Sequence, residues 1–313
     1  MAVELQSTEV VAVVVTVNDD SPQVLTVGAP GGIPAVPSGP LLADHRSLQA
    51  GLRDWVTSQT GLHPGYVEQL YTFADRERAG SHTRMISVSY LGLTRAATPD
   101  GGSAWRNWYD LFPWEDRRDD NGIQRSHHLV QQLHGWADCG ASDAVRHSRS
   151  ERIAATFGQA SRPWRPEDCL HRYELLWEAG LLAESRAHGS GRPAATPGHV
   201  PTTGTRMRHD HRRIVATGMA RLRAKIQYRP VIFELMPPTF TLGQLQNVVE
   251  ALTGTRLHKQ NFRRLVAQED LVEETGERTT DTGGRPAKLM RFRADVLSER
   301  PSTGLRLPQS RPR

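Results

Sequence analysis

The stretch from Phe240 to Phe292 constrains the fold more than any other part of the chain, because it holds two amphipathic segments separated by a short glycine turn. Thr241 is a residue type that caps helices, and the apolar residues after it recur at helical spacing, which predicts a helix with one buried face. These apolar residues are Leu242, Leu245, Val248, Val249 and Leu252. Gly254 then interrupts the pattern, and glycine readily adopts the left-handed backbone conformation of such a turn.

A second amphipathic segment follows the turn. Its predicted buried side chains are Leu257, Phe262, Leu265 and Val266, and its predicted outward side chains are Lys259, Gln260, Arg263 and Arg264. The segments Leu271 to Glu274 and Leu289 to Arg293 then predict two short strands, joined by a Gly-rich loop that carries Arg285, with Lys288 at the start of the return. Two helices, a tight turn and a basic hairpin in this order predict a winged helix-turn-helix, whose second helix reads double-stranded DNA.

We expect two kinds of DNA contact. Residues in the N-terminal half of the second helix would reach base edges, whereas Arg285 and Lys288 on the hairpin would reach phosphates. The full predicted DNA-binding set is Thr241, Lys259, Gln260, Asn261, Arg263, Arg264, Arg285 and Lys288. Asn261 precedes Phe262, which must face the core and can turn Asn261 aside. A single winged helix covers few base pairs, so we expect a homodimer on a near-palindromic operator.

The distribution of charge supports DNA binding by the C-terminal part. Residues 206 to 313 carry 21 Lys and Arg against 11 Asp and Glu, whereas residues 1 to 205 carry 18 against 23. Such a basic end favours binding to a phosphate backbone, because each phosphate that is neutralised releases counterions. The chain contains neither a signal peptide pattern nor a membrane-spanning apolar run, so we expect a cytoplasmic protein. Cys139 and Cys169 are expected to be reduced thiols.

At the other end of the chain, Thr8 to Val17 is rich in β-branched residues, and Gln23 to Val27 reads as a second strand after a turn, which predicts a hairpin. The segment Gly31 to Pro40 is dominated by glycine and proline and is expected to be irregular. A helix capped by Asp44 and ended by Gly61 should follow, with Leu48, Leu52, Trp55 and Val56 on its apolar face.

The run Val36 to Leu62 resembles the signature loop and helix of a Nudix domain. Gly39, Arg53 and Trp55 fall on motif positions. His45 replaces the first glutamate of the motif, Asp54 stands after the arginine, and the paired metal-binding glutamates are replaced by Thr57 and Ser58, or by Ser58 and Gln59 if the register includes the extra residue before Gly61. Nudix hydrolysis needs hard carboxylate ligands for a divalent metal. The resemblance therefore predicts a catalytically inactive domain, with no metal and no cofactor, that keeps a nucleotide cleft.

The continuation Gly65 to Leu93 deepens this resemblance, with a strand, a loop carrying Arg76, Arg78 and Arg84, and a second strand from Met85. Together with the segments FTLGQLQ, NFRR and GRPA near the other end, it resembles the Nudix-related transcriptional regulators of NAD metabolism, most closely the NadQ type. The resemblance covers residues 8 to 118 and 205 to 295. It implies a repressor of NAD biosynthesis or salvage genes that senses an adenine-containing nucleotide. The predicted effector-binding residues are Arg53, Arg76, Arg78 and Arg84.

The remaining segments indicate an α+β protein with added helices. Residues 1–118 are predicted to be a Nudix-like α/β/α sandwich, 119–204 a helical insertion with a flexible loop from Gly189 to Gly204, 205–230 a connecting helix, 231–297 the winged helix, and 298–313 a disordered basic tail. Within the insertion, Pro166 to Ala187 reads as one helix.

Two features of the middle of the chain allow more than one interpretation. The aromatic cluster could stack an adenine, but core packing is the favoured interpretation. Its members are Trp105, Trp108, Tyr109, Phe112 and Trp114. The histidines near Cys139 match no compact zinc pattern and are expected at the surface.

Two alternative functions remain open at this point. The first is a divergent Nudix hydrolase of ADP-ribose-like pyrophosphates, with Asp54, Glu68 or Glu77 holding a metal. The second is a protein-interaction module that uses the winged helix for docking.

Overall fold

The computed structural model describes residues 7–28, 32–74, 85–187, 203–280 and 286–293. The strands are β1 Ser7–Asn18, β2 Ser21–Thr26, β3 Ser38–Pro40, β4 Tyr66–Phe73, β5 Met85–Leu93, β6 Ala104–Asn107, β7 Val272–Thr279 and β8 Ala287–Phe292. The longer helices are α1 Leu48–Thr60, α3 Asp120–Asp138, α4 Asp143–Phe157, α5 Cys169–Glu178, α7 His211–Ile226, α8 Leu242–Thr253 and α9 Lys259–Glu269. Short helical turns complete the list: α2 Trp108–Leu111, η1 Pro113–Glu115, η2 Pro166–Asp168, α6 Ala183–Ala187 and η4 Val231–Leu235.

A mixed sheet forms the centre of the N-terminal part, with strand order β4-β5-β1-β2-β6 and β3 paired to β1. β1 runs parallel to β5 and antiparallel to β2, so the predicted hairpin is confirmed. Its turn residues Asp19 and Asp20 both have positive φ, of 47° and 57°. Such turns match the right-handed twist of the strands, and aspartate tolerates this conformation better than most residues.

The loop before α1 differs from the sequence prediction in two places. Ser38–Pro40 is a short strand instead of irregular chain, because its backbone pairs with Glu9 to Val11 of β1. The helix cap is Ser47 instead of Asp44, because the Ser47 hydroxyl accepts a hydrogen bond from Ala50 N at 3.1 Å. The other end is as predicted, since Gly61 ends the helix with a φ of 68°.

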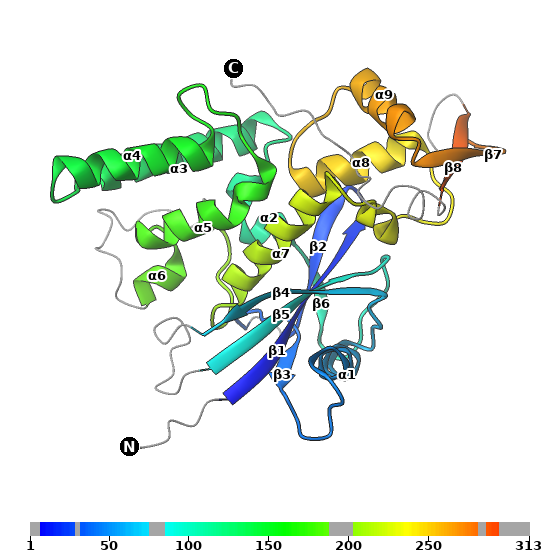
Figure 1. Ribbon diagram of the computed structural model, residues 1–313, viewed down its shortest axis with the longest axis horizontal. Helices are drawn as coiled ribbons and strands as arrows, with labels where there is room; N and C mark the ends of the chain where they lie inside the picture. Colours follow the sequence, from blue (N-terminus) through cyan, green and yellow to red (C-terminus); the bar gives the residue numbers. More distant parts are fainter. Residues whose placement is uncertain (1–6, 29–31, 75–84, 188–202, 281–285, 294–313) are drawn as a thin grey trace.

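The two faces of the sheet are covered by different helices (Figure 1). Alternate residues of β1 point to opposite faces, and all of them from Val10 to Val15 are buried. Val10 and Val14 pack in the cluster that includes α1, whereas Val13 lies in the larger cluster that includes α7. Gly218 permits the close approach of α7, because a Cβ atom at this position would lie 2.9 Å from Val13 Cγ1.

The helical insertion lies beside α7 and comprises α3 to α6. The segment predicted as one helix from Pro166 to Ala187 is in fact three pieces, η2, α5 and α6. The interruption follows α5, where Gly180 takes a left-handed φ of 72°. Most of the loop predicted from Gly189 to Gly204 and the whole predicted tail 298–313 lie outside the described residues.

The aromatic cluster belongs to the core. Trp108, Tyr109, Phe112 and Trp114 are all at most 6% exposed and pack with the insertion helices and α7. Trp105 is half-buried and donates its Nε1 hydrogen to Ala97 O. The favoured interpretation of the sequence, core packing instead of adenine stacking, is therefore confirmed for the four buried rings.

The C-terminal part has the predicted order of two helices followed by a hairpin. The strands β7 and β8 are longer than predicted because they pair beyond a register shift between Glu274 and Arg278. The hairpin is attached by backbone hydrogen bonds between Phe240 and Met290 and by the stacked rings of Phe233 and Phe292, whose centroids are 4.3 Å apart. Within the described residues, no helix is long and apolar enough to cross a membrane.

Candidate nucleic-acid interface

Helix α8 is the scaffold of the interface and begins with a capping box. Gln244 N donates to Thr241 Oγ1 at 3.1 Å, and the Gln244 side chain accepts from Thr241 N at 2.8 Å. Thr241 is 3% exposed, so its hydroxyl serves the helix end. The contact of Thr241 with DNA stays a prediction, and the structure shows its hydroxyl engaged in the cap.

A buried carboxylate fixes the turn between α8 and α9. Glu250 is 4% exposed and accepts hydrogen bonds from Leu257 N at 3.0 Å, Gln246 Nε2 at 2.8 Å and Arg256 Nη1 at 2.8 Å. Gly254 ends α8 with a φ of 68°, as predicted. Because Arg256 and Leu257, just before α9, are bound to α8 itself, the direction in which α9 leaves the scaffold is fixed.

Helix α9 presents a polar face to solvent. Phe262 and Val266 are each 2% exposed and pack inward, which confirms the predicted buried side. The exposed residues are Lys259, Gln260, Asn261, Arg263 and Arg264. The first turn contains no acidic residue, and the N-cap His258 makes no side-chain capping bond. The positive end of the helix dipole and the basic side chains therefore lie together, which suits phosphate and base edges. The base contacts themselves stay predictions.

The hairpin is less basic than its sequence suggested, because acidic residues on β7 face the cations of β8. Lys288 Nζ lies 2.7 Å from Glu274 Oε1, and Arg291 Nε lies 2.6 Å from Glu273 Oε1. Opposite charges across antiparallel strands attract one another in this way. A phosphate must therefore compete with Glu274 for Lys288. Arg285, the other predicted contact on the hairpin, lies outside the described residues.

A buried ion cluster connects α8 to the rest of the molecule. Glu115 accepts hydrogen bonds from Arg172 Nε at 2.7 Å and from Arg223 Nη1 at 2.5 Å, and all three side chains are 0% exposed. Burial opposes ionisation of the carboxyl group, but the two guanidinium groups outweigh it and keep the pKa of Glu115 below its usual value. The cluster was not predicted from the sequence, although Arg223 stands on the apolar side of its helix.

The carboxyl end of α8 is where this cluster meets the DNA-binding unit. Ala251 O accepts from Tyr109 Oη at 2.6 Å, and Leu252 O accepts from Arg223 Nε at 2.8 Å. Gly254 O accepts from Arg117 N at 2.7 Å. The last carbonyl groups of a helix carry partial negative charge and need donors. Here the donors come from the body of the molecule, so the winged helix is fixed to it.

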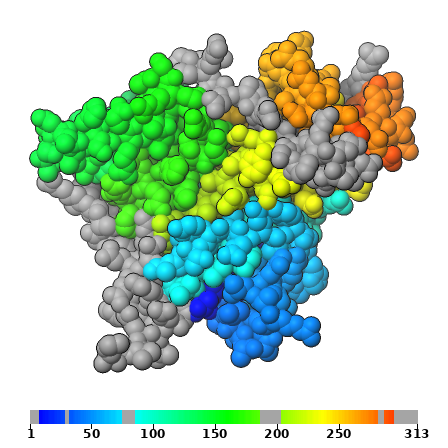
Figure 2. All heavy atoms as spheres, viewed as in Figure 1, coloured from blue at the N-terminus to red at the C-terminus, as the bar shows by residue number. Residues whose placement is uncertain are grey.

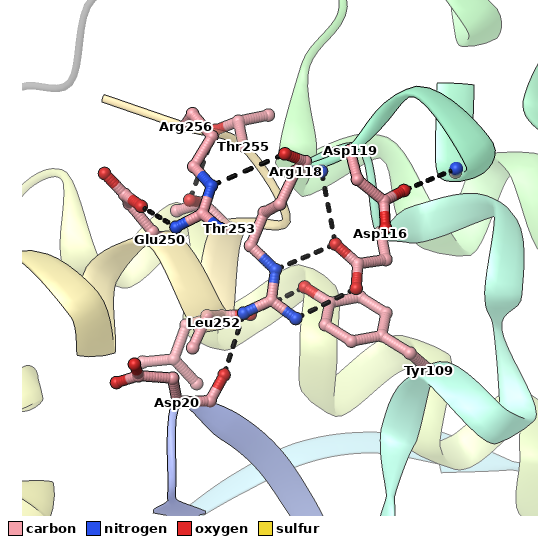
Figure 3. Close-up of polar contacts among 12 residues, drawn as sticks. Asp20, Tyr109, Asp116, Arg118, Asp119, Glu250, Leu252, Thr253, Thr255 and Arg256 are labelled. Atoms are coloured by element: carbon pink, nitrogen blue, oxygen red, sulfur yellow. Dashed lines mark hydrogen bonds and ion pairs between the residues drawn. The ribbon is translucent and has the colours of Figure 1, made fainter. Parts of the chain in front are cut away.

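A second set of polar contacts reaches the same place from the sheet (Figure 3). Arg118 binds both oxygens of Asp116, at 2.8 and 2.9 Å, and donates from Nη1 to Asp20 O at 2.8 Å. Asp20 Oδ2 accepts from Asn247 Nδ2 on α8 at 3.0 Å. The turn of the β1–β2 hairpin therefore contacts the scaffold helix directly.

The predicted effector residues are only partly placed. Arg53 on α1 donates to Pro64 O and, at 3.2 Å, to Gly65 O, so its guanidinium anchors the segment before β4. These bonds occupy part of the guanidinium group, and the contact of Arg53 with a nucleotide phosphate stays a prediction. Arg76, Arg78 and Arg84 lie outside the described residues, and their role stays a prediction.

The positions of the Nudix metal ligands do not suit a metal. Thr57 Oγ1 bonds to Leu62 O and His63 Nδ1, Ser58 Oγ to Trp55 O, and the amide of Gln59 to the backbone of Ser38 at 2.9 and 3.2 Å. These neutral groups stabilise the helix and the neighbouring loop.

The carboxylates considered as replacements are differently placed. Glu68 is engaged by Lys225, and Asp54 is largely exposed and 4.0 Å from His45. Glu77 lies outside the described residues. Within the part of the chain that the structure describes, no three His, Cys, Asp or Glu side chains are grouped as a metal site.

The fold and the face of α9 define a class: a Nudix-like domain followed by a winged helix. Residues 232–292 match the family described as the NrtR DNA-binding winged helix domain. A curated relative, the ADPR responsive transcriptional repressor NtrR of Acinetobacter baylyi, is 42% identical over 83 residues, which are 26% of this chain. This chain spans 33% of the length of that relative.

Two solved structures share the fold over nearly the whole chain. Shewanella oneidensis NrtR complexed with a 27mer DNA has a TM-score of 0.57 at 20% identity, with 96% of this chain and 98% of that chain covered. A MutT/nudix family protein from Enterococcus faecalis has a TM-score of 0.54 at 17% identity, with 94% and 88% covered. The resemblance is thus confirmed in two respects: the chain shares the fold of NrtR over nearly its whole length, and residues 232–292 match the NrtR winged helix domain.

Proposed function

We propose that this protein is a transcriptional repressor of NAD biosynthesis or salvage genes that binds operator DNA through α9. The observation that carries the proposal is the exposed face of α9, where Lys259, Arg263 and Arg264 surround Gln260 and no acidic residue occupies the first turn. The match of residues 232–292 to a DNA-binding domain supports it. Figure 2 shows that α9 and the hairpin lie at the surface at one end of the molecule.

We propose further that residues 1–118 sense an adenine-containing nucleotide and that residues 231–297 bind the DNA. The relative from Acinetobacter baylyi is described as ADPR responsive, so ADP-ribose is the first effector to test. Hydrolysis of that nucleotide is not expected, because Thr57, Ser58 and Gln59 supply no anionic ligand for a divalent metal. A homodimer on paired half-sites completes the proposal, since one winged helix reads few base pairs.

The experiment is a pull-out of genomic DNA by the purified protein, followed by binding curves on the recovered sites. Binding that prefers the recovered sites over random DNA, and that changes when ADP-ribose is added, supports the proposal. A parallel magnesium-dependent turnover assay on ADP-ribose and NAD tests the inactive cleft. If the protein recovers no DNA sequence in preference to others, operator binding is contradicted. If the protein hydrolyses ADP-ribose or NAD and Asp54→Ala abolishes this turnover, the protein is a hydrolase instead.

A further inference from the structure

A groove lies between the helical insertion and the reading helix. It encloses about 230 Å³, and its walls come from η2, from α7, from the α8–α9 turn and from α9 itself. Asn261 and Leu265, four residues apart on α9, line the groove on the side of the winged helix, and Arg165 to Glu167 line it on the side of the insertion. The insertion therefore adjoins the element that reads DNA, and one of the predicted DNA contacts, Asn261, faces this groove.

Three of the side chains that line the groove are arginines, namely Arg165, Arg223 and Arg256. Arg165, Arg256 and His258 line it and are all exposed, and Glu167 is the acidic residue among the lining groups. Arg256 already pairs with Glu250, whereas the Arg165 guanidinium forms no ion pair with any residue that the structure describes. An exposed arginine beside the first turn of a reading helix is complementary to phosphate.

The backbone that carries Arg165 is held in place by the buried ion cluster. Arg172 donates to Arg165 O at 3.0 Å and to Pro166 O at 3.2 Å, and Arg223 donates to Pro166 O at 3.0 Å. The same Arg223 donates to Leu252 O at the end of α8. One set of buried groups thus fixes both walls of the groove, so Arg165 has a defined position relative to α9.

We propose that the helical insertion is part of the DNA-binding surface and that Arg165 binds a backbone phosphate next to the one nearest the start of α9. This inference rests on the proposed function and extends the contact surface beyond the winged helix. The partner is the sugar-phosphate backbone of duplex DNA, because an exposed guanidinium that has no ion-pair partner among the described residues suits a phosphate.

The test uses the full chain and a fluorescein-labelled duplex of random sequence, because a phosphate contact acts on all DNA alike. Arg165→Ala should weaken binding and lower the slope of log affinity against log salt by about 0.9. When the salt is raised from 50 to 200 mM, both proteins lose affinity for DNA. The fold-loss of the variant should be smaller than that of the unmodified protein by a factor of roughly 3.5. Arg165→Lys should keep the slope, since it keeps the positive charge.

The matched control is Arg162→Ala. Arg162 lies on the same loop, but it binds Glu151 through an ion pair of 2.5 Å and a backbone hydrogen bond, so its loss should leave the salt slope unchanged. Equal urea midpoints for the Arg165 variants and the unmodified protein exclude an effect on folding. An unchanged slope for Arg165→Ala would overturn the inference while leaving DNA binding by α9 intact. Absence of binding by the unmodified protein at low salt would instead overturn the proposed function.

Discussion

The guanidinium group of Arg223 and the carboxylate of Glu115 meet at 2.5 Å with both side chains fully buried. Arg223 belongs to α7, which also packs on the sheet, and its Nε reaches the last turn of α8. The sheet, the insertion and the winged helix therefore share one ionic connection. If nucleotide binding shifts the sheet or the insertion, the shift reaches the winged helix only when this ion cluster moves with it.

Removing the charge of Glu115 should destabilise the fold strongly. Glu115→Gln leaves Arg172 and Arg223 buried without their counter-ion, and the loss of one partner of a buried pair costs about 3 to 5 kcal/mol. The free energy of unfolding from urea titration measures this cost. Glu178→Gln is the control, because Glu178 pairs with Arg152 at the surface and should cost less than about 1 kcal/mol. Equal losses of unfolding free energy in the two variants would show that the buried cluster stabilises the fold no more than a surface ion pair does.

The stability of the protein should fall in mild acid because of His211. Its Nδ1 accepts a hydrogen bond from Val36 N at 3.1 Å, and burial, followed by the nearby His209 and Arg208, lowers its pKa to about 3. The unfolded chain takes up a proton below about pH 6.5, whereas the folded chain stays neutral there. The contribution of His211 is therefore complete above that pH and is lost as pH falls towards 3.

The slope of this loss from His211 alone is at most about 1.4 kcal/mol per pH unit. His211→Asn should flatten the decrease in unfolding free energy between about pH 6.5 and 5, a range above the titration of ordinary carboxyl groups. The comparison variant is His171→Asn. The pKa of His171 is raised by a hydrogen bond to Asp168, so its effect has the opposite sign. If the unfolding free energy decreases equally over this pH range in His211→Asn and in the unmodified protein, His211 is not the cause of the decrease.

Substitution of base-reading residues and of phosphate-binding residues should have different effects on the affinity for DNA. Gln260→Ala or Arg263→Ala should cost roughly 1 to 3 kcal/mol on the operator and relax sequence preference, because a bidentate base contact distinguishes base pairs. Lys288→Ala should weaken binding to all DNA alike and lower the salt slope by less than the full 0.9 of a free lysine, because Glu274 competes for it. Binding curves in a salt series on operator and random DNA give both quantities. Equal losses on both DNAs for the α9 variants would remove α9 as the reading element.

The local elements could be predicted because their signals are local. Thr241, Gly254 and the apolar spacing of Leu245 and Val249 lie within a few residues of one another, and the observed α8 begins and ends where they indicate. The cap of α1, Ser47, lies three residues after the predicted Asp44, because both are good capping residues and only the folded loop decides between them.

The connections between elements could not be predicted because they join distant positions. Glu115 and Arg223 are separated by 108 residues, and nothing near either one identifies the other. One signal was present: Arg212 and Arg223 fall on the apolar side of α7, among Val215, Met219 and Leu222, and both are buried against carboxylates. Charges on an apolar stripe require buried partners, which is a usable rule. The pairing of Lys288 with Glu274 also depends on strand register.

The measurement that tests the central claim most directly is the affinity of the full chain for a recovered operator with and without ADP-ribose, at one fixed salt concentration. The same titration with Arg263→Ala shows whether the binding passes through α9. We predict operator binding that exceeds binding to random DNA, that is weakened by roughly 1 to 3 kcal/mol in Arg263→Ala, and that changes when ADP-ribose is present. Equal affinity for operator and random DNA, unaffected by ADP-ribose and by Arg263→Ala, would contradict the account.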